Sequence, residues 1–304
     1  MHRLLLFICL FGCGTGGVPG DGGRALPNPG YAPYELQLDA DGRARDLFPN
    51  EIGLGGPFAR VEGQTLALYM HQCRTDAPCR VVRCTSKDGS SFSTPEVVAE
   101  HPDGLRDPFI REVDGGLTLW SVSDDGRRLN ELSLDGESLT QTVHQLGDEE
   151  GRLSSPSIIE MGGRQQLFLM HDHEGVTTIL HRTAPGEALD SLHGICSERP
   201  CPETERLTGL EVRYASSGTG RGVLRALLST TMGSENGVLS FAASHNGQDW
   251  SPFAFNPALS GGGSLGHASQ VLFKGSYYVF AVSGRAETRI VVAINERPAA
   301  SQRW

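Results

Sequence analysis

Two histidines at matching positions, with a neighbouring aspartate, are side chains whose types and spacing could bind a ligand or a metal. His71 and His171 each follow a methionine at the end of an apolar run, and Asp172 directly follows His171. Imidazole nitrogens and carboxylate oxygens can line a polar pocket or ligate a metal ion. The histidines could instead recur because matching positions of a repeat carry matching residues for packing, with imidazoles bonded to backbone. The sequence leaves both interpretations open.

A unit that recurs along the chain indicates which elements position these side chains. In its clearest copies a proline-containing start leads into a short apolar strand, a glycine turn and a second apolar strand. The copies begin about 50 residues apart, the length of one four-stranded propeller blade. We therefore predict an all-β five-bladed β-propeller, with blades of about four antiparallel strands, over residues 31–304. The five copies begin with Gly56–Val61, Asp107–Val113, Ser155–Glu160, Leu210–Ala215 and His267–Phe273.

The fifth blade is one strand short at the C-terminal end of the chain, because few residues follow Arg289–Asn295. The segment Tyr34–Leu38 could supply the missing strand and close the ring by hydrogen bonds between the two ends of the chain. Two further segments, Ser86–Phe92 and Ser244–Trp250, share the form Ser-x-Asp/Asn-Gly-x-x-aromatic. They resemble the Asp-box turns of sialidase-type propellers, so we expect a structural turn at each.

The second copy starts with Arg106-Asp107-Pro108-Phe109. This run resembles the Arg-Asp-Pro motif in the second blade of the five-bladed glycoside hydrolases of families 43, 32 and 68. In those enzymes three carboxylates ring the mouth of the central funnel. One carboxylic acid protonates the leaving oxygen and a second carboxylate acts as base or nucleophile. The resemblance implies that a carbohydrate or another small polar ligand binds in the funnel, with Arg106 and Asp107 at its mouth.

Two of the three family carboxylates are missing. Blade one begins with Gly56 and blade three with Ser155, and neither residue type can exchange the required proton. Asp107 alone stands at a family position, where the resemblance gives it the role of orienting the sugar and tuning the acid. Other carboxylates close to the strand starts or ends could substitute, and these are Glu51, Glu149, Glu150 and Asp172.

His267 starts the fifth copy after Leu265 and Gly266. It resembles the histidine that faces the central channel in some family 43 enzymes and there helps to hold a calcium ion or water. The resemblance therefore implies that His267, with His71, His171 and Asp172, contributes to the ligand site. It also implies a calcium ion in the channel as an optional metal, and no required cofactor.

The N-terminus has the features of an exported lipoprotein. A short charged start precedes an apolar run, Leu4 to Phe11, that is too short to span a bilayer as a permanent helix. The following Gly12-Cys13 resembles the end of a bacterial lipobox, which implies that Cys13 is lipidated. We expect residues 1–13 to be the signal peptide and residues 14–30 a flexible tether, with an outer-membrane or cell-surface location. An ordinary signal peptide with an incidental Cys13 is the alternative.

Cysteine spacing suits an oxidising compartment. Cys73 and Cys79 bracket one short loop, and Cys196 and Cys201 bracket another, so we predict two local disulfides. A zinc site is the rival interpretation, although the four cysteines lack the usual two-residue spacing. Cys84 is left over within an apolar run and is expected to be a buried free thiol.

The composition limits the partners. The formal net charge is −10, which argues against nucleic acid as a ligand. We expect a monomer that touches the membrane only through its lipid. Three functions remain: a carbohydrate-binding propeller that lacks the family cleavage mechanism, an active glycosidase with relocated carboxylates, and a protein-interaction propeller of the cell envelope.

Overall fold

The protein is described by a computed structural model. The structure describes residues 34–134, 141–145, 151–161, 163–183, 190–192, 195, 205–216, 222–232, 236–253, 256–260, 264–284 and 288–295. All regular elements in these ranges are β-strands. No helix in the described part of the chain is long and apolar enough to cross a membrane.

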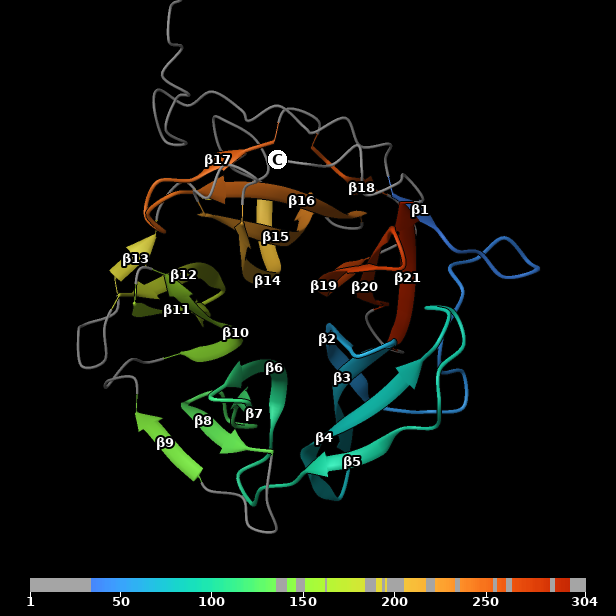
Figure 1. Cartoon of the computed structure of the whole chain (residues 1–304), viewed down its shortest axis with the longest axis horizontal. Coiled ribbons are helices and arrows are strands. Elements are labelled where there is room, and N and C mark those ends of the chain that lie inside the picture. The colour runs from blue at the N-terminus through green and yellow to red at the C-terminus, as the bar shows by residue number, and fades with distance from the viewer. Residues whose placement is uncertain are drawn as a thin grey trace, which may run out of the picture.

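The strands form five antiparallel sheets around a central axis, and the first strand of blades one to five (β2, β6, β10, β14 and β19) lies innermost (Figure 1). This arrangement confirms the predicted five-bladed propeller. Blade one contains β2 (Leu54–Glu62), β3 (Thr65–Arg74), β4 (Ala77–Ser86) and β5 (Glu96–Ala99); blade two contains β6 (Arg106–Val113), β7 (Gly116–Val122), β8 (Arg128–Ser133) and β9 (Gln141–Gln145). Blade three contains β10 (Arg152–Met161), β11 (Arg164–His173), β12 (Val176–Arg182) and β13 (Asp190–Leu192). Blade four contains β14 (Glu205–Ser216), β15 (Gly222–Met232), β16 (Asn236–Ser244), β17 (Ser251–Pro252) and β18 (Leu259–Ser260); blade five contains β19 (Leu265–Phe273), β20 (Ser276–Ser283), β21 (Arg289–Asn295) and β1 (Glu35–Leu36).

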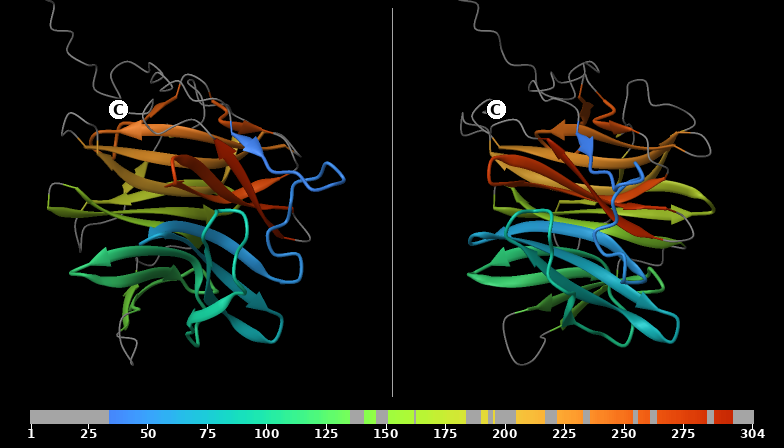
Figure 2. Two further views of the ribbon diagram at one scale, coloured as in Figure 1. Left: turned by 45° about the vertical axis from the view of Figure 1, so that its right-hand side comes forward. Right: turned by 90° about the vertical axis from the view of Figure 1, so that its right-hand side faces the viewer.

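The ring closes as predicted, with the N-terminal strand on the last blade. β1 pairs antiparallel with β21, Glu35 lies opposite Ile294, and Leu36 lies opposite Ala293. The amide of Gln37 extends the pairing by donating to the carbonyl of Val292 at 2.9 Å. Figure 2 shows this blue N-terminal segment beside the red C-terminal strand. Closure by both ends of the chain leaves blade five with four strands, like blades one to three.

Hydrogen bonds from backbone amides to serine hydroxyls join innermost strands of neighbouring blades. The hydroxyl of Ser157 in blade three accepts the amide proton of Val212 in blade four at 3.0 Å. The hydroxyl of Ser269 in blade five likewise accepts the amide proton of Ala59 in blade one at 2.8 Å. All four residues are fully buried or nearly so, and each bond satisfies an amide that faces another sheet. These serines therefore fix the position of one blade against the next.

The two Asp-box-like turns are structural, as their sequences predict. In Ser86–Phe92 and Ser244–Trp250 the glycine amide donates to the hydroxyl of the first serine, at 2.8 and 2.9 Å. The closing aromatic ring then packs against the preceding blade. The ring centroids of Phe92 and Phe280 of blade five are 5.7 Å apart, and those of Trp250 and Phe168 of blade three are 5.9 Å apart. Both turns therefore contribute to the seams between blades.

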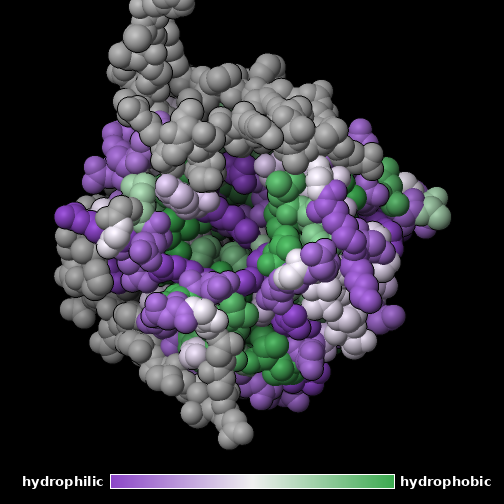
Figure 3. All heavy atoms as spheres, in the orientation of Figure 1, coloured by the Kyte–Doolittle hydropathy of each residue, from purple (hydrophilic) through white to green (hydrophobic). Residues whose placement is uncertain are grey.

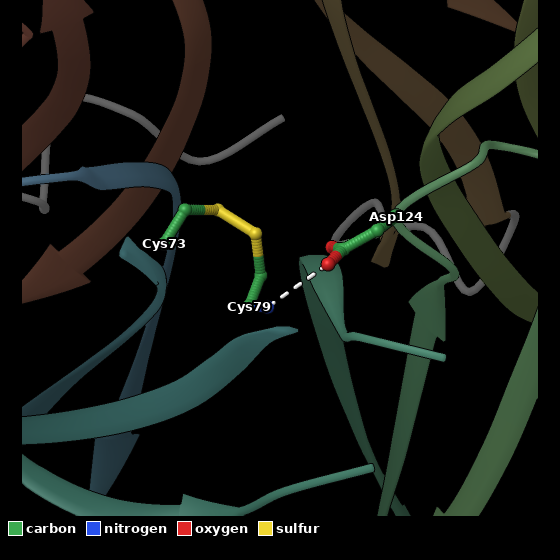
Figure 4. A group of neighbouring side chains, drawn as sticks. All are labelled: Cys73, Cys79 and Asp124. Atoms are coloured by element: carbon green, nitrogen blue, oxygen red, sulfur yellow. Dashed lines mark hydrogen bonds between the residues drawn. A yellow bond between two sulfur atoms is a disulfide. The ribbon is translucent and has the colours of Figure 1, made fainter. Parts of the chain in front are cut away.

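The predicted disulfide between Cys73 and Cys79 is present and joins β3 to the adjacent β4 (Figure 4). The carboxylate of Asp124, from blade two, accepts the amide proton of Cys79 at 3.0 Å. Cys84 is the expected buried free thiol, and burial raises its pKa to about 12, so it is unreactive. Because Cys73 and Cys79 are bonded to each other, they supply no thiolate to a zinc ion. The predictions for Cys13 and for the pair Cys196 and Cys201 concern residues outside the described ranges.

Candidate functional site

Each innermost strand is interrupted near its start by a β-bulge, and these bulges meet at one end of the central channel, called the mouth here. Four bulge residues have positive φ: Gly56 at 54°, Asp107 at 50°, Ser155 at 50° and His267 at 35°. Holding a residue other than glycine in this region costs about 1–2 kcal/mol. Strain of this kind concentrates at ligand sites, where it aims side chains that a regular strand would point elsewhere.

A small cavity of about 30 Å³ lies at the mouth and is lined by residues from all five innermost strands. A volume of this size holds a water molecule or two, whereas sites for small molecules occupy about 300–1,000 Å³. Figure 3 shows one face of the molecule hollowed at its centre, with hydrophilic and hydrophobic residues both bordering the hollow. The cavity can therefore admit a water molecule or a single ligand hydroxyl, and a sugar ring would have to lie across its entrance.

Asp107 forms the centre of the site and contacts three other blades. Its Oδ1 lies 3.3 Å from Nδ1 of His71 in blade one and 3.6 Å from Nδ1 of His267 in blade five. Its Oδ2 accepts the amide proton of Ser155 in blade three at 3.2 Å. The side chain is buried and only 8% of the residue is exposed. The structure thus brings together three of the predicted site residues, Asp107, His71 and His267.

The surroundings of Asp107 stabilise its charged form. Burial acts to raise the pKa of this carboxyl group. The nearby imidazoles of His267 and His71 and the amide of Ser155 oppose burial and together hold the pKa of Asp107 well below its ordinary value. Asp107 is consequently a carboxylate at neutral pH and accepts hydrogen bonds.

The two imidazoles have different roles. Nδ1 of His71 lies 3.1 Å from the backbone amide of Asp107, so it accepts that proton when unprotonated and can donate to the carboxylate only when protonated. Nδ1 of His267 lies 3.0 Å from the hydroxyl of Ser155. Serine and aspartate therefore approach the same nitrogen of His267, whereas a nucleophilic triad needs them on opposite nitrogens. The cluster does not have the geometry of a serine hydrolase.

The glycine at the start of blade one has a steric explanation. A Cβ atom added to Gly56 would lie 2.7 Å from Oδ1 of Asp107 and 2.8 Å from Nδ1 of His71. Asp107 and His71 thus occupy the space that an aspartate at this position would need. Glycine is the residue that fits the bulge as the mouth is now built.

Glu211 of blade four is a second carboxylate at the cavity, and the sequence analysis did not identify it. Its Oε1 accepts from the guanidinium of Arg213 at 2.7 Å and from the hydroxyl of Ser269, while its Oε2 accepts the amide proton of Gln270 at 3.0 Å. Arg213 also donates to the carbonyl of Ala59 at 2.7 Å. A signal was present, because charged residues 211 and 213 alternate with apolar neighbours in an innermost strand.

The other predicted site residues lie outside this cluster. Arg106 is half-buried, and its carbonyl accepts from the hydroxyl of Ser121 at 2.7 Å. His171 is half-buried with its ring stacked on His173, the centroids being 6.1 Å apart. Asp172 is exposed and accepts from the hydroxyl of Thr177 at 3.3 Å. None of the three predicted residues lines the small cavity.

The donors around Asp107 fit a calcium ion poorly. Calcium takes six to eight oxygen ligands. Here one carboxylate faces two imidazole nitrogens, and its second oxygen is occupied by the amide of Ser155. In the described part of the chain, the one group of three potential ligands close enough to share an ion consists of Cys73, Cys79 and Asp124, and it contains the disulfide.

Solved structures share this fold. An endo-1,4-β-xylanase from Bacteroides thetaiotaomicron matches with a TM-score of 0.60 and 16% sequence identity, over 80% of this chain and 90% of the xylanase. An α-L-arabinofuranosidase from Podospora anserina, in complex with cellotriose, matches with a TM-score of 0.60 and 12% identity, over 90% and 99% of the two chains. A thermostable family-43 glycoside hydrolase matches with a TM-score of 0.57 and 13% identity, over 80% and 91%. No protein-family model and no curated protein matches the sequence. The likeness to these glycoside hydrolases is therefore one of fold.

Alanine at Gly56 tests whether Asp107 and His71 fill the space in blade one. The matched control is Gly63→Ala, because Gly63 has a similar φ of 59° but open space around its Cβ position. We expect Gly63→Ala to lower the free energy of unfolding by about 1 kcal/mol and Gly56→Ala to lower it by about 1–3 kcal/mol more, as overpacking does. Urea denaturation measures both. Equal decreases in the free energy of unfolding for the two variants would mean that Asp107 and His71 can move to make room for a side chain at Gly56.

The lowered pKa of Asp107 predicts how its contribution to stability changes with pH. A carboxyl group whose pKa is lower in the folded than in the unfolded protein contributes its full stabilisation when the pH is above the unfolded-state value of about 4. This stabilisation is lost as the pH falls from there through the pKa of the folded protein. We expect Asp107→Asn to be less stable than the parent by about 3 kcal/mol at pH 7, with the difference shrinking below about pH 4. If the difference in free energy of unfolding between parent and variant stays constant down to about pH 2, the lowered pKa of Asp107 is contradicted.

Proposed function

We propose that the protein binds carbohydrate at the mouth of its channel and does not cleave it by the two-carboxylate mechanism of glycoside hydrolases. The fold is shared with a xylanase and with an arabinofuranosidase that was determined with cellotriose. Asp107 is the residue through which the mouth would orient a ligand, because it is the charged acceptor at the cavity that faces the rim histidine His267.

The observation that carries this proposal is that both carboxylates at the cavity are held as hydrogen-bond acceptors. Asp107 faces two imidazoles and an amide, and Glu211 accepts from a guanidinium, a hydroxyl and an amide. Among the described residues, the cavity has no other carboxyl group. Glycosidic cleavage requires a carboxylic acid that carries a proton to the leaving oxygen. Loss of general acid and base catalysis, each contributing about 10²- to 10⁴-fold, leaves binding as the remaining function.

The size of the cavity suggests how the ligand is held. A hydroxyl group or a bridging water can reach Asp107, while the sugar ring stays at the rim beside His267, whose side chain is 31% exposed. This mode of binding differs from that of an enzyme funnel, in which the scissile bond must reach the carboxylates. It favours recognition of a chain end or a protruding hydroxyl.

The proposal includes lipidation at Cys13 and display of the propeller at the outer membrane or cell surface. Two signals support it: the short apolar run before Gly12-Cys13 and the glycine-rich segment that follows. We expect the mature N-terminus, analysed by mass spectrometry from the native host, to carry lipid on Cys13. A mature protein that begins at another residue or carries an unmodified Cys13 would contradict the anchor.

A glycan array probed with the purified full-length protein, with hydrolysis products assayed in parallel, tests the function. We expect binding without cleavage, and we expect Asp107→Asn to weaken the best ligand at least about tenfold, as loss of a charge-assisted hydrogen bond does. His267→Gln is a second variant, because His267 lies at the rim and is less buried than Asp107. The matched control is Asp114→Asn, an exposed aspartate with a φ of 51° in the turn after the same strand.

The outcomes separate the candidate functions. Unchanged binding by both Asp107→Asn and His267→Gln would remove the mouth as the site. Release of reducing sugar by the parent that is abolished in Asp107→Asn would show an active glycosidase and overturn the proposed mechanism. Absence of any glycan ligand would reject carbohydrate binding and leave the protein-interaction propeller.

A further inference from the structure

A second and larger cavity lies on blade one, where the chain leaves for blade two. Its volume is about 360 Å³, within the range of small-molecule sites. It is bounded by the β3–β4 hairpin and by the connection from β5 to β6, and its polar lining includes Gln72, Arg74, Arg80, Glu100 and His101. Unlike the cavity at Asp107, this one has room for a whole monosaccharide.

The two cavities are linked through neighbouring residues of β3. Successive side chains of a strand point to opposite faces of the sheet. His71 contacts Asp107 at the mouth, whereas the next residue, Gln72, contacts Arg80 of the second cavity. Consecutive residues at one end of β3 therefore serve the two cavities from opposite faces of the sheet.

Arg80 is positioned by its neighbours before any ligand arrives. Its Nε and Nη2 donate to Oε1 of Gln72 at 3.1 and 2.9 Å, and its Nη1 lies 3.3 Å from Oε1 of Glu100. Gln72 is only 4% exposed and is held from the other side by Glu51, at 3.2 Å. A guanidinium has five N–H groups, so two remain for a ligand. A donor held in advance binds without the entropic cost of being ordered.

The wall of this cavity is covalently restrained. Cys79 lines it and is bonded to Cys73, and the backbone of Cys79 is held from blade two by Asp124 and by the amide of Leu105 (Figure 4). Contacts from two blades and a disulfide thus fix the hairpin. The cavity is a built feature of the blade one–blade two seam.

The charge of the lining is opposite to that of the protein. The chain carries a formal net charge of −10, but the cavity presents two arginines, Arg74 and Arg80, against one carboxylate, Glu100. Arg74 is exposed and has no acidic partner among the described residues, and the side chain of Glu100 is 64% exposed, so it can move aside. A planar guanidinium recognises a carboxylate through paired hydrogen bonds.

We propose that the second cavity binds the carboxylate of an acidic sugar, which makes uronic-acid-containing saccharides the ligand class of this protein. Arg80 supplies the fixed donors, Arg74 supplies a second positive charge at the rim, and Glu100 competes with the ligand for Arg80. The identification of a sugar rests on the proposed function, whereas the preference for a carboxylate rests on the cavity itself.

Calorimetric titration of the full-length protein with D-galacturonic acid and with neutral D-galactose tests the proposal. We expect a preference for the acid, and we expect Arg74→Gln and Arg80→Gln each to weaken its binding at least about tenfold. Glu100→Gln should strengthen acid binding severalfold, because it removes the competing carboxylate. This gain cannot arise from misfolding. Arg43→Gln, an exposed arginine in the 39–43 loop, is the control and should bind like the parent.

The variants keep this inference separable from the function proposed for the mouth. Equal affinities for the acid and the neutral sugar, or unchanged acid binding in both arginine variants, would overturn the second site while leaving the effect of Asp107→Asn intact. Loss of acid preference in the arginine variants, with normal binding by Asp107→Asn, would support the second site and reject the mouth. Weakened acid binding by Glu100→Gln would also count against the proposal.

Discussion

One buried carboxylate connects four of the five blades, and the arrangement of the mouth depends on it. Asp107 of blade two contacts histidines from blades one and five and the backbone of blade three. A buried charge of this kind lowers the stability of the fold unless hydrogen-bond donors surround it. Removing one partner destabilises the protein more than replacing the whole set by apolar residues would. Asp107 therefore joins the blades at the central channel and is also a charged hydrogen-bond acceptor at the mouth.

This double role constrains the residues around Asp107. The donors that hold Asp107 in place also keep it ionised, and the space they fill excludes a side chain at Gly56. At Ser155 the backbone amide and the hydroxyl are both engaged, with Asp107 and His267 respectively. Gly56 and Ser155 therefore belong to the framework around Asp107. Within this framework Asp107 is held as a hydrogen-bond acceptor.

The sequence predicted the architecture better than the site. Five copies of one unit, the closing strand at Tyr34–Leu38 and the two glycine turns are local patterns with a regular period, and the structure confirms each. A repeat reveals which positions are equivalent but not which side chains meet across the axis. For this reason the pairing of His71 with His171 did not predict that His71 would contact Asp107, or that Glu211 and Arg213 would share the channel. Those contacts depend on the radius of the ring and on bulges whose positive φ values have no simple sequence signature outside glycine.

The closing strand has a mechanical consequence. β1 is held to β21 by a short run of backbone pairs, and it is the first element that a pull on the preceding chain would reach. Traction on an N-terminal tether would act on this seam before any other, and detaching β1 would open the circle at a defined point while blades one to four keep their own strands. The resistance of the molecule to shear would then be set by a few backbone hydrogen bonds together with one buried side chain, Tyr34, which packs against Phe241 and bonds to Gln270.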